Sequence, residues 1–248
     1  MSDLPPSPDD ATDTARMKAA LVAAAAVAFA AAPLAVPFDG FEPGAYPVPQ
    51  DDPPVQPAGY AFGIWGPIYL WLVAHALYGL IRRSDSAHWD GTRWPMALSL
   101  AVGAGWLAIA QVSPIWATVL IWVMLLSALL ALWRAPERED RWLLRAPISL
   151  YAGWLTAASW VAIGLLGAGY GVGPGEVGWA WIGLAGALAT ALAVTRLAPP
   201  APFYAAAVAW ALIAVAVANW GAQWGLVAAA LGGAAVVAAP ALARLRAG

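Results

Sequence analysis

The positions of the lysine and arginine residues constrain this chain more than any other feature. Apolar segments of about 18–22 residues, each long enough to cross a hydrocarbon core of roughly 30 Å, alternate with polar segments. When these segments are treated as eight transmembrane helices, alternate connections hold either several basic residues or none, which is the positive-inside pattern. Both termini and all 12 cations then lie on the cytoplasmic side, and these cations are Arg16, Lys18, Arg82, Arg83, Arg93, Arg134, Arg138, Arg141, Arg145, Arg196, Arg244 and Arg246.

The same pattern predicts the number of helices. Adding or removing one helix would move the later basic clusters to the opposite side of the membrane, so charge and hydropathy agree on eight. The expected fold is therefore all-α, a polytopic membrane protein of the kind found in a bacterial inner membrane. The predicted helices lie near residues 19–37, 60–81, 95–112, 115–133, 147–168, 178–195, 202–219 and 223–243.

Composition agrees with a membrane protein and excludes several classes of function. The chain is 62% hydrophobic and 10% charged, with a mean hydropathy of +0.70, which a soluble domain would not tolerate on its surface. Membrane lipids are therefore expected partners, and the absence of a polybasic tail argues against nucleic acid. Without cysteine the chain has no disulfide, no thiol catalysis and no cysteine-ligated metal.

The first segments leave two interpretations open. Residues 1–16 are rich in Pro, Asp and Ser and are expected to form a disordered cytoplasmic leader. Alternatively, Arg16 and Lys18 precede an Ala-rich stretch ending in Ala30-Ala31-Ala32-Pro33, which resembles a signal peptide with a small-residue cleavage site. Cleavage there would leave seven helices.

The predicted external loop at residues 38–59 is long and carries six prolines and four acids. Long loops in compact proteins tend to be functional or disordered, and proline lowers the entropic cost of ordering them. We expect this loop to form a lid over the external end of the bundle; a proline-rich spacer without a ligand role is the alternative.

The chain has 16 tryptophans, and those near helix ends suit the interfacial belt of a membrane protein. Others fall deeper, where an indole N–H needs a partner or a ligand. On the second predicted helix, Phe62, Trp65 and Tyr69 share one face, while Trp71, His75 and Tyr78 share another. One face is expected to line a cavity, and the alternative is that all these rings pack between helices.

Three segments resemble the tryptophan-rich sensory protein family (TspO), relatives of the mitochondrial translocator protein. Its second helix begins Pro-x-Gly-x-x-Phe-x-x-Trp followed by Leu-Tyr or Ile-Tyr, and residues 57–69 here read Pro57-Ala58-Gly59-Tyr60-Ala61-Phe62-Gly63-Ile64-Trp65-Gly66-Pro67-Ile68-Tyr69. Trp106 matches a tryptophan of the third helix, and the pair Tyr151 and Trp154 followed by Thr156 is similar to Tyr-x-x-Trp-x-Thr of the fifth. The resemblance implies a five-helix bundle that binds tetrapyrroles or sterol-like lipids in a cavity covered by the loop after the first helix.

The chain also departs from this family. It has Gly103 and Ala162 where the family usually has buried asparagines, so the cavity shape is expected to persist with different ligand chemistry. The last three helices extend beyond the short family members. We therefore predict a leader at 1–16, a TspO-like bundle at 17–168 and three additional transmembrane helices at 169–248, where many small residues suit close helix packing.

Catalytic signals are scarce, and we predict that the protein is not an enzyme and has no catalytic residue and no dedicated metal site. No Asp, Glu, Lys or Arg lies inside the predicted bilayer zone, which argues against coupled transport. His75 is the ionisable residue there. It is interpreted either as a neutral histidine bonded to a neighbouring helix or as the ligand of a pigment metal.

Two functional hypotheses follow. In the first, an aromatic cavity binds a flat hydrophobic ligand, such as a porphyrin, haem, bacteriochlorophyll or lipid, in a sensory, regulatory or ligand-handling role. In the second, the chain is a structural or assembly subunit of a larger photosynthetic or respiratory membrane complex, and a homo-oligomer is also left open. The predicted cavity residues are Tyr60, Phe62, Trp65, Tyr69, Trp106, Tyr151 and Trp154.

Overall fold

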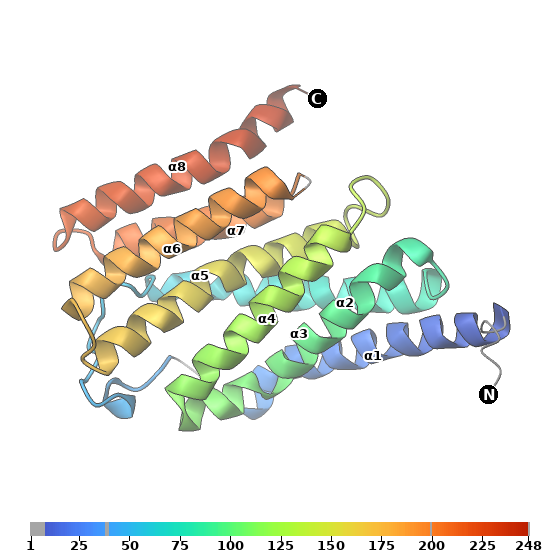
Figure 1. The fold of residues 1–248 in the computed structure, drawn as a ribbon, viewed down its shortest axis with the longest axis horizontal. Helices are drawn as coiled ribbons and strands as arrows, with labels where there is room; N and C mark the ends of the chain where they lie inside the picture. The colour runs from blue at the N-terminus through green and yellow to red at the C-terminus, as the bar shows by residue number, and fades with distance from the viewer. Residues whose placement is uncertain (1–7, 38–39, 199, 248) are drawn as a thin grey trace, which may run out of the picture.

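The computed structural model describes residues 8–37, 40–198 and 200–247, and within these ranges the chain forms eight α-helices and no strand (Figure 1). The expected all-α class is confirmed. Six helices are long and apolar enough to cross a membrane, whereas α7 and the apolar stretch Trp224–Ala239 of α8 are shorter. The helices are α1 (Pro8–Ala35), α2 (Trp65–Arg82), α3 (Ala87–Val112), α4 (Pro114–Arg134), α5 (Arg145–Gly169), α6 (Gly175–Leu197), α7 (Pro202–Ala218) and α8 (Trp224–Ala247).

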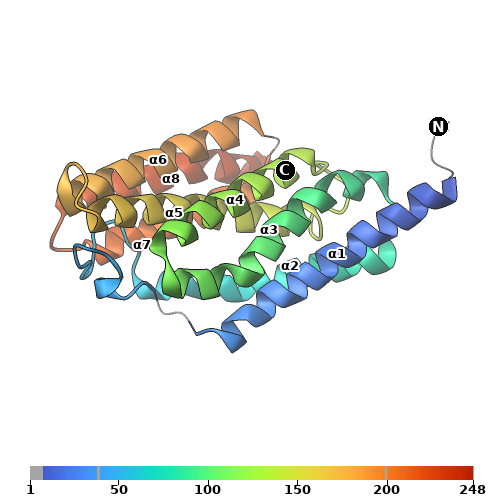
Figure 2. The same ribbon diagram turned by 60° about the horizontal axis from the view of Figure 1, so that its bottom comes forward.

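Helix α5 is the centre of the bundle. It packs against α4 on one side and against α6 and α7 on the other, while α1 and α8 lie at opposite edges (Figures 1 and 2). In α5, 78% of the most apolar window is buried, compared with 28–56% in the other five candidate spans. The buried side chains form one continuous core from α1 to α8, so the predicted segments 17–168 and 169–248 share that core.

The two ends of the bundle differ in charge. The start of α1, the end of α8 and the α2–α3, α4–α5 and α6–α7 connections lie at the same end, on the right in Figure 1. The basic residues occur in these connections and in the adjoining parts of the helices, so we call this the basic end. The opposite end, which carries Glu42, Asp51, Asp52 and Glu176, is called the acidic end. Asp39, predicted to lie on that side, falls outside the described residues.

Helix α1 begins earlier than predicted. It starts at Pro8, so residues 8–16 are helical where the sequence predicts a disordered leader; residues 1–7 lie outside the described ranges. A contact with α3 holds this part of the helix, because Arg93 Nη1 donates to the Ala15 carbonyl at 2.9 Å.

Helices α2 and α3 also begin at different residues from those predicted. The expected start of the second helix is instead a 3₁₀ helix, η2 (Gly59–Ile64), and Trp210 Nε1 of α7 donates to its Ala61 carbonyl at 3.0 Å. Helix α3 starts at Ala87 and continues through Pro95. Proline cannot donate to the carbonyl four residues earlier, and Arg134 Nη1 instead approaches that carbonyl, on Gly91, at 3.4 Å.

The segment between α1 and η2, described from residue 40 onwards, is packed onto the bundle. The Val48 N–H donates to the Gly169 carbonyl at the end of α5 (2.8 Å), and the Asn219 amide at the end of α7 donates to the Pro54 carbonyl (2.8 Å). The segment therefore covers the acidic ends of α5 and α7 and is not confined to the first five helices.

Candidate functional site

Five of the seven predicted cavity residues lie together at the interface of η2, α2 and α5. Trp65 stacks on Tyr69, with ring centroids 5.3 Å apart and an interplanar angle of 16°. Trp154 meets both Trp65 and Phe62 edge-on, at centroid distances of 6.1 and 5.9 Å, and Tyr151 lies 6.4 Å from Trp65. Because Phe29 of α1 also contacts these rings, we define the aromatic cluster as Phe29, Phe62, Trp65, Tyr69, Tyr151 and Trp154.

The other two predicted residues lie apart from this cluster. Tyr60 is 49% exposed and packs edge-on against Trp210 of α7, with centroids 5.4 Å apart. Trp106 lies 6.4 Å from Phe41 of the α1–η2 segment, and its Nε1 donates to the Ala117 carbonyl at 2.8 Å. The structure therefore does not bring these two rings into the aromatic cluster.

Helix α5 contributes the two most buried rings of the cluster. Tyr151 is fully buried, and its hydroxyl lies 3.0 Å from Ser99 Oγ. Ser99 uses its own hydrogen to donate to the Met124 carbonyl, so Tyr151 is the donor to Ser99.

Trp154 differs from Tyr151 in its hydrogen bonding. Trp154 is 2% exposed, yet its indole N–H has no hydrogen-bond partner among the described residues. Leaving such a buried donor unsatisfied costs about 1–3 kcal/mol. The cluster therefore contains one buried polar group that is available to an acceptor.

Phe29 occupies the middle of the cluster. Its ring centroid lies 5.0 Å from that of Tyr69 and 5.8 Å from those of Trp65 and Tyr151. Sequence reasoning missed this residue, although Phe29 is the one aromatic side chain in the Ala-rich stretch of α1.

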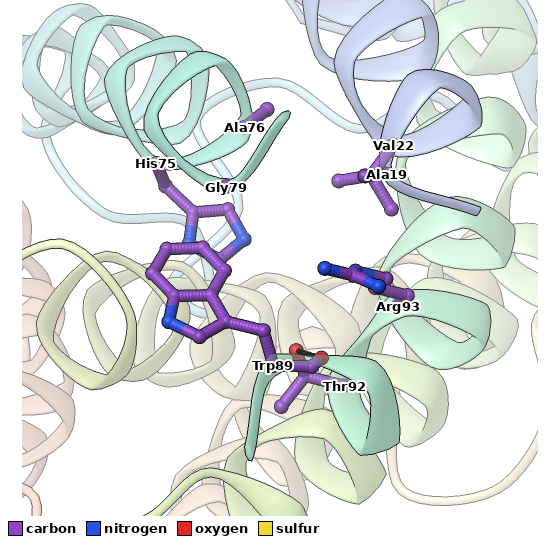
Figure 3. A pocket seen from close by; sticks show the side chains of 8 residues that line it. All are labelled: Ala19, Val22, His75, Ala76, Gly79, Trp89, Thr92 and Arg93. Carbon is purple, nitrogen blue, oxygen red and sulfur yellow. Dashed lines mark hydrogen bonds between the residues drawn. The ribbon is translucent and has the colours of Figure 1, made fainter. Parts of the chain in front are cut away.

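Two cavities are described, and neither is lined by a residue of the aromatic cluster. The first has a volume of about 10 Å³ and lies near the basic end, between α1, α2 and α3 (Figure 3). The second has about 30 Å³ and lies between α5, α6, α7 and the α1–η2 segment. Ligand pockets typically measure 300–1,000 Å³, so both are far too small for a tetrapyrrole. A flat ligand at the cluster would require helices or side chains to move.

Side chains on the second face of α2 form hydrogen bonds with the α4–α5 connection. Trp71 Nε1 donates to the Trp142 carbonyl at 2.8 Å, and His75 Nδ1 lies 2.7 Å from the Leu143 carbonyl. Residues 71, 75 and 78 are spaced by four and three, so their side chains share one face of the helix. We call these contacts, together with those of Asp140 below, the loop anchor.

Asp140 is the main acceptor of the loop anchor. Its carboxylate receives bonds from Arg83 Nε (2.6 Å) and Trp89 Nε1 (2.9 Å), and the Tyr78 hydroxyl approaches it at 3.4 Å. The bonds from Arg83 lower the pKa of this carboxyl below its ordinary value. Sequence reasoning missed Asp140, because nothing in the local sequence separates it from the neighbouring acids.

A close approach between helices makes the loop anchor possible. A Cβ atom at Gly79 would lie 2.7 Å from Cζ3 of Trp89, so only glycine lets this indole lie across α2. The Trp89 ring is 2% exposed and stacks on His75, with centroids 5.0 Å apart and an interplanar angle of 17° (Figure 3).

This geometry favours the hydrogen-bonded interpretation of His75. A carbonyl only accepts, so Nδ1 carries the proton in its bond to Leu143, and Nε2 is the acceptor in the neutral ring. One ring face is covered by Trp89, and the imidazole borders the 10 Å³ cavity, which has about the volume needed for one water molecule. A tetrapyrrole does not fit at this position.

Comparison with known proteins places the chain in a family. A family model described as TSPO-like protein matches residues 18–243. The chain belongs to this family. The match runs from α1 into α8, so the three C-terminal helices of this TSPO-like protein fall within it. Neither the curated proteins nor the solved structures give a match.

Proposed function

We propose that this TSPO-like membrane protein binds a flat hydrophobic ligand, a tetrapyrrole or a lipid, at the aromatic cluster. The observation that carries the proposal is the buried indole N–H of Trp154, which no acceptor among the described residues satisfies. Aromatic faces supply burial and stacking for a planar ligand, and one directed donor orients a carbonyl or carboxylate on its edge. The proposed role is sensory, regulatory or ligand-handling, without a catalytic step.

Tryptophan fluorescence tests this proposal directly. Adding protoporphyrin to the purified protein should quench tryptophan emission saturably, and Trp65→Ala should weaken binding by about 1–3 kcal/mol because it removes the ring that stacks on Tyr69. The matched control is Trp220→Ala, since Trp220 is 64% exposed and contacts Trp224 at the acidic end. Unsaturable quenching, or equal affinity in the two variants, would contradict the proposal, because the porphyrin would then only partition into the detergent.

Extraction in a mild detergent separates this function from the assembly-subunit alternative. A protein that purifies without a stoichiometric protein partner and binds porphyrin saturably agrees with the proposal. A stoichiometric partner that stays bound, combined with no saturable porphyrin binding, would favour a subunit of a larger membrane complex.

We further propose a bacterial inner-membrane location with the basic end in the cytoplasm. The basic connections at one end of the bundle support this orientation, because short basic loops resist translocation. A reporter fused after Gly248 should be cytoplasmic, and one inserted near Tyr46 should be exported. The reverse result at either position would contradict the orientation.

A further inference from the structure

The centre of the proposed ligand site is filled by a side chain of the protein itself. Phe29 is 4% exposed, and its ring lies edge-on to both members of the stacked pair Trp65 and Tyr69. A planar ligand that stacks on the inner face of these rings needs the space that the phenyl ring of Phe29 now occupies.

Helix α3 provides the room for this ring. A Cβ atom at Gly103 would lie 2.7 and 2.8 Å from Cε2 and Cδ2 of Phe29, distances that real Cβ contacts essentially never show. Any residue other than glycine at position 103 would therefore push the phenyl ring out of its present place. Phe29 and Gly103 act as a matched pair that fills the centre of the first five helices.

The surroundings of Phe29 on α1 let this ring move. Helix α1 packs mainly against α2 and α3 at the edge of the bundle, and 33% of its apolar window is buried, as in α3 and α6. The residues around Phe29, from Ala23 to Ala32, are mostly alanines. Moving the ring therefore breaks few other large side-chain contacts.

We propose that Phe29 is a plug that sets access to the aromatic cluster. The ligand enters by displacing the phenyl ring from between Trp65, Tyr69 and Tyr151, and one planar ring of the ligand takes its place. This inference rests on the proposed function, because it concerns the same site. The apparent affinity is then the intrinsic affinity multiplied by the fraction of molecules in which the plug is open.

The binding experiment compares Phe29→Ala with Phe203→Ala, using protoporphyrin as the probe. Phe203 is the matched control because it makes the same kind of edge-on contact, with Trp71 on the second face of α2. Phe29→Ala should bind protoporphyrin about tenfold more tightly than the natural protein, since no ring has to be displaced, and Phe203→Ala should be unchanged.

The outcomes separate the plug from the proposed function. Equal or weaker binding by Phe29→Ala, with saturable binding by the natural protein, overturns the plug and leaves the function. Saturable binding by Phe29→Ala alone would show that the ligand does not displace the ring in the natural protein, which overturns both the plug and ligand binding by the natural protein. An absence of binding in both overturns both proposals.

A thermal-unfolding cycle tests the same contact without ligand. Gly103→Ala should lower the unfolding temperature of the natural protein because the new Cβ meets the Phe29 ring, and most of this loss should vanish in the Phe29→Ala background. An equal loss in both backgrounds would show that Phe29 does not fill the space beside Gly103, which would overturn the plug.

Discussion

The two halves of α2 stabilise the bundle by different kinds of contact. Toward the acidic end, Trp65 and Tyr69 meet other rings, and the neighbouring Trp154 N–H has no partner among the described residues. Toward the basic end, Trp71 and His75 bond to backbone carbonyls of the α4–α5 connection. Ring contacts tolerate centroid distances of about 4.5–7 Å, whereas hydrogen bonds require a narrower range of distances and angles.

This difference indicates which half can adapt to a ligand. The loop anchor holds its polar groups in defined positions, so a shift there breaks several bonds together. Rings in the aromatic cluster can slide or rotate with smaller losses and can exchange one aromatic neighbour for another. The four variants below test whether the basic half is rigid and the acidic half adaptable.

The largest effect is expected for Asp140→Ala. It leaves the buried Trp89 N–H without an acceptor, and the variant should lose about 2–3 kcal/mol of unfolding free energy in detergent. The pKa of Asp140 is lower in the native protein than in the unfolded chain, where it is about 4. Its contribution to stability is therefore fully present above the unfolded pKa and is lost as pH falls through the native pKa. A variant as stable as the natural protein near pH 7 would show that the loop anchor is not a rigid element.

A smaller loss is expected when the approach between α2 and Trp89 is blocked. Gly79→Ala places a Cβ within 2.7 Å of the indole and should cost about 1–2 kcal/mol in thermal or denaturant unfolding. The control is Gly105→Ala in α3, where a Cβ meets nothing within 4 Å, so helix propensity should instead stabilise by about 0.5–1 kcal/mol. Equal effects of the two substitutions would argue against tight packing at Trp89.

His75→Leu should have a modest effect because it removes one hydrogen bond and retains an apolar side chain beside Trp89. The expected loss is roughly 0.5–1.5 kcal/mol of unfolding free energy, and any pigment that copurifies should keep its absorption spectrum. An absorption band that disappears from the folded variant would reinstate His75 as a pigment ligand.

The smallest change in stability is expected for Trp154→Phe, which tests the aromatic cluster and not the loop anchor. Removing an indole N–H that lacks a partner should offset most of the cost of the smaller ring, so the unfolding free energy should change by less than about 1 kcal/mol. Protoporphyrin affinity should nevertheless fall, because the ligand loses its directed donor. A loss of stability above about 2 kcal/mol would mean that this N–H is satisfied in the free protein.

Part of the candidate site could be predicted from local spacing. Tyr151 and Trp154 are three residues apart, as are Phe62 and Trp65, so each pair points to one side of its helix or turn, and the structure brings the two pairs together. Phe29 could not be assigned in this way. Its partners lie on α2, α3 and α5, and its position depends on the missing side chain of Gly103.

The sequence by itself determined the all-α class, the eight helices, the sorting of cations to one end and the two faces of α2, because hydropathy, charge and helical periodicity are local properties. Only the tertiary structure decided that Phe29 fills the aromatic cluster and that Asp140 accepts hydrogen bonds from Arg83, after α2, and from Trp89 of α3. Both depend on how helices distant in sequence cross one another. Packing of this kind is set by the shape of all neighbouring side chains together, which no single segment encodes.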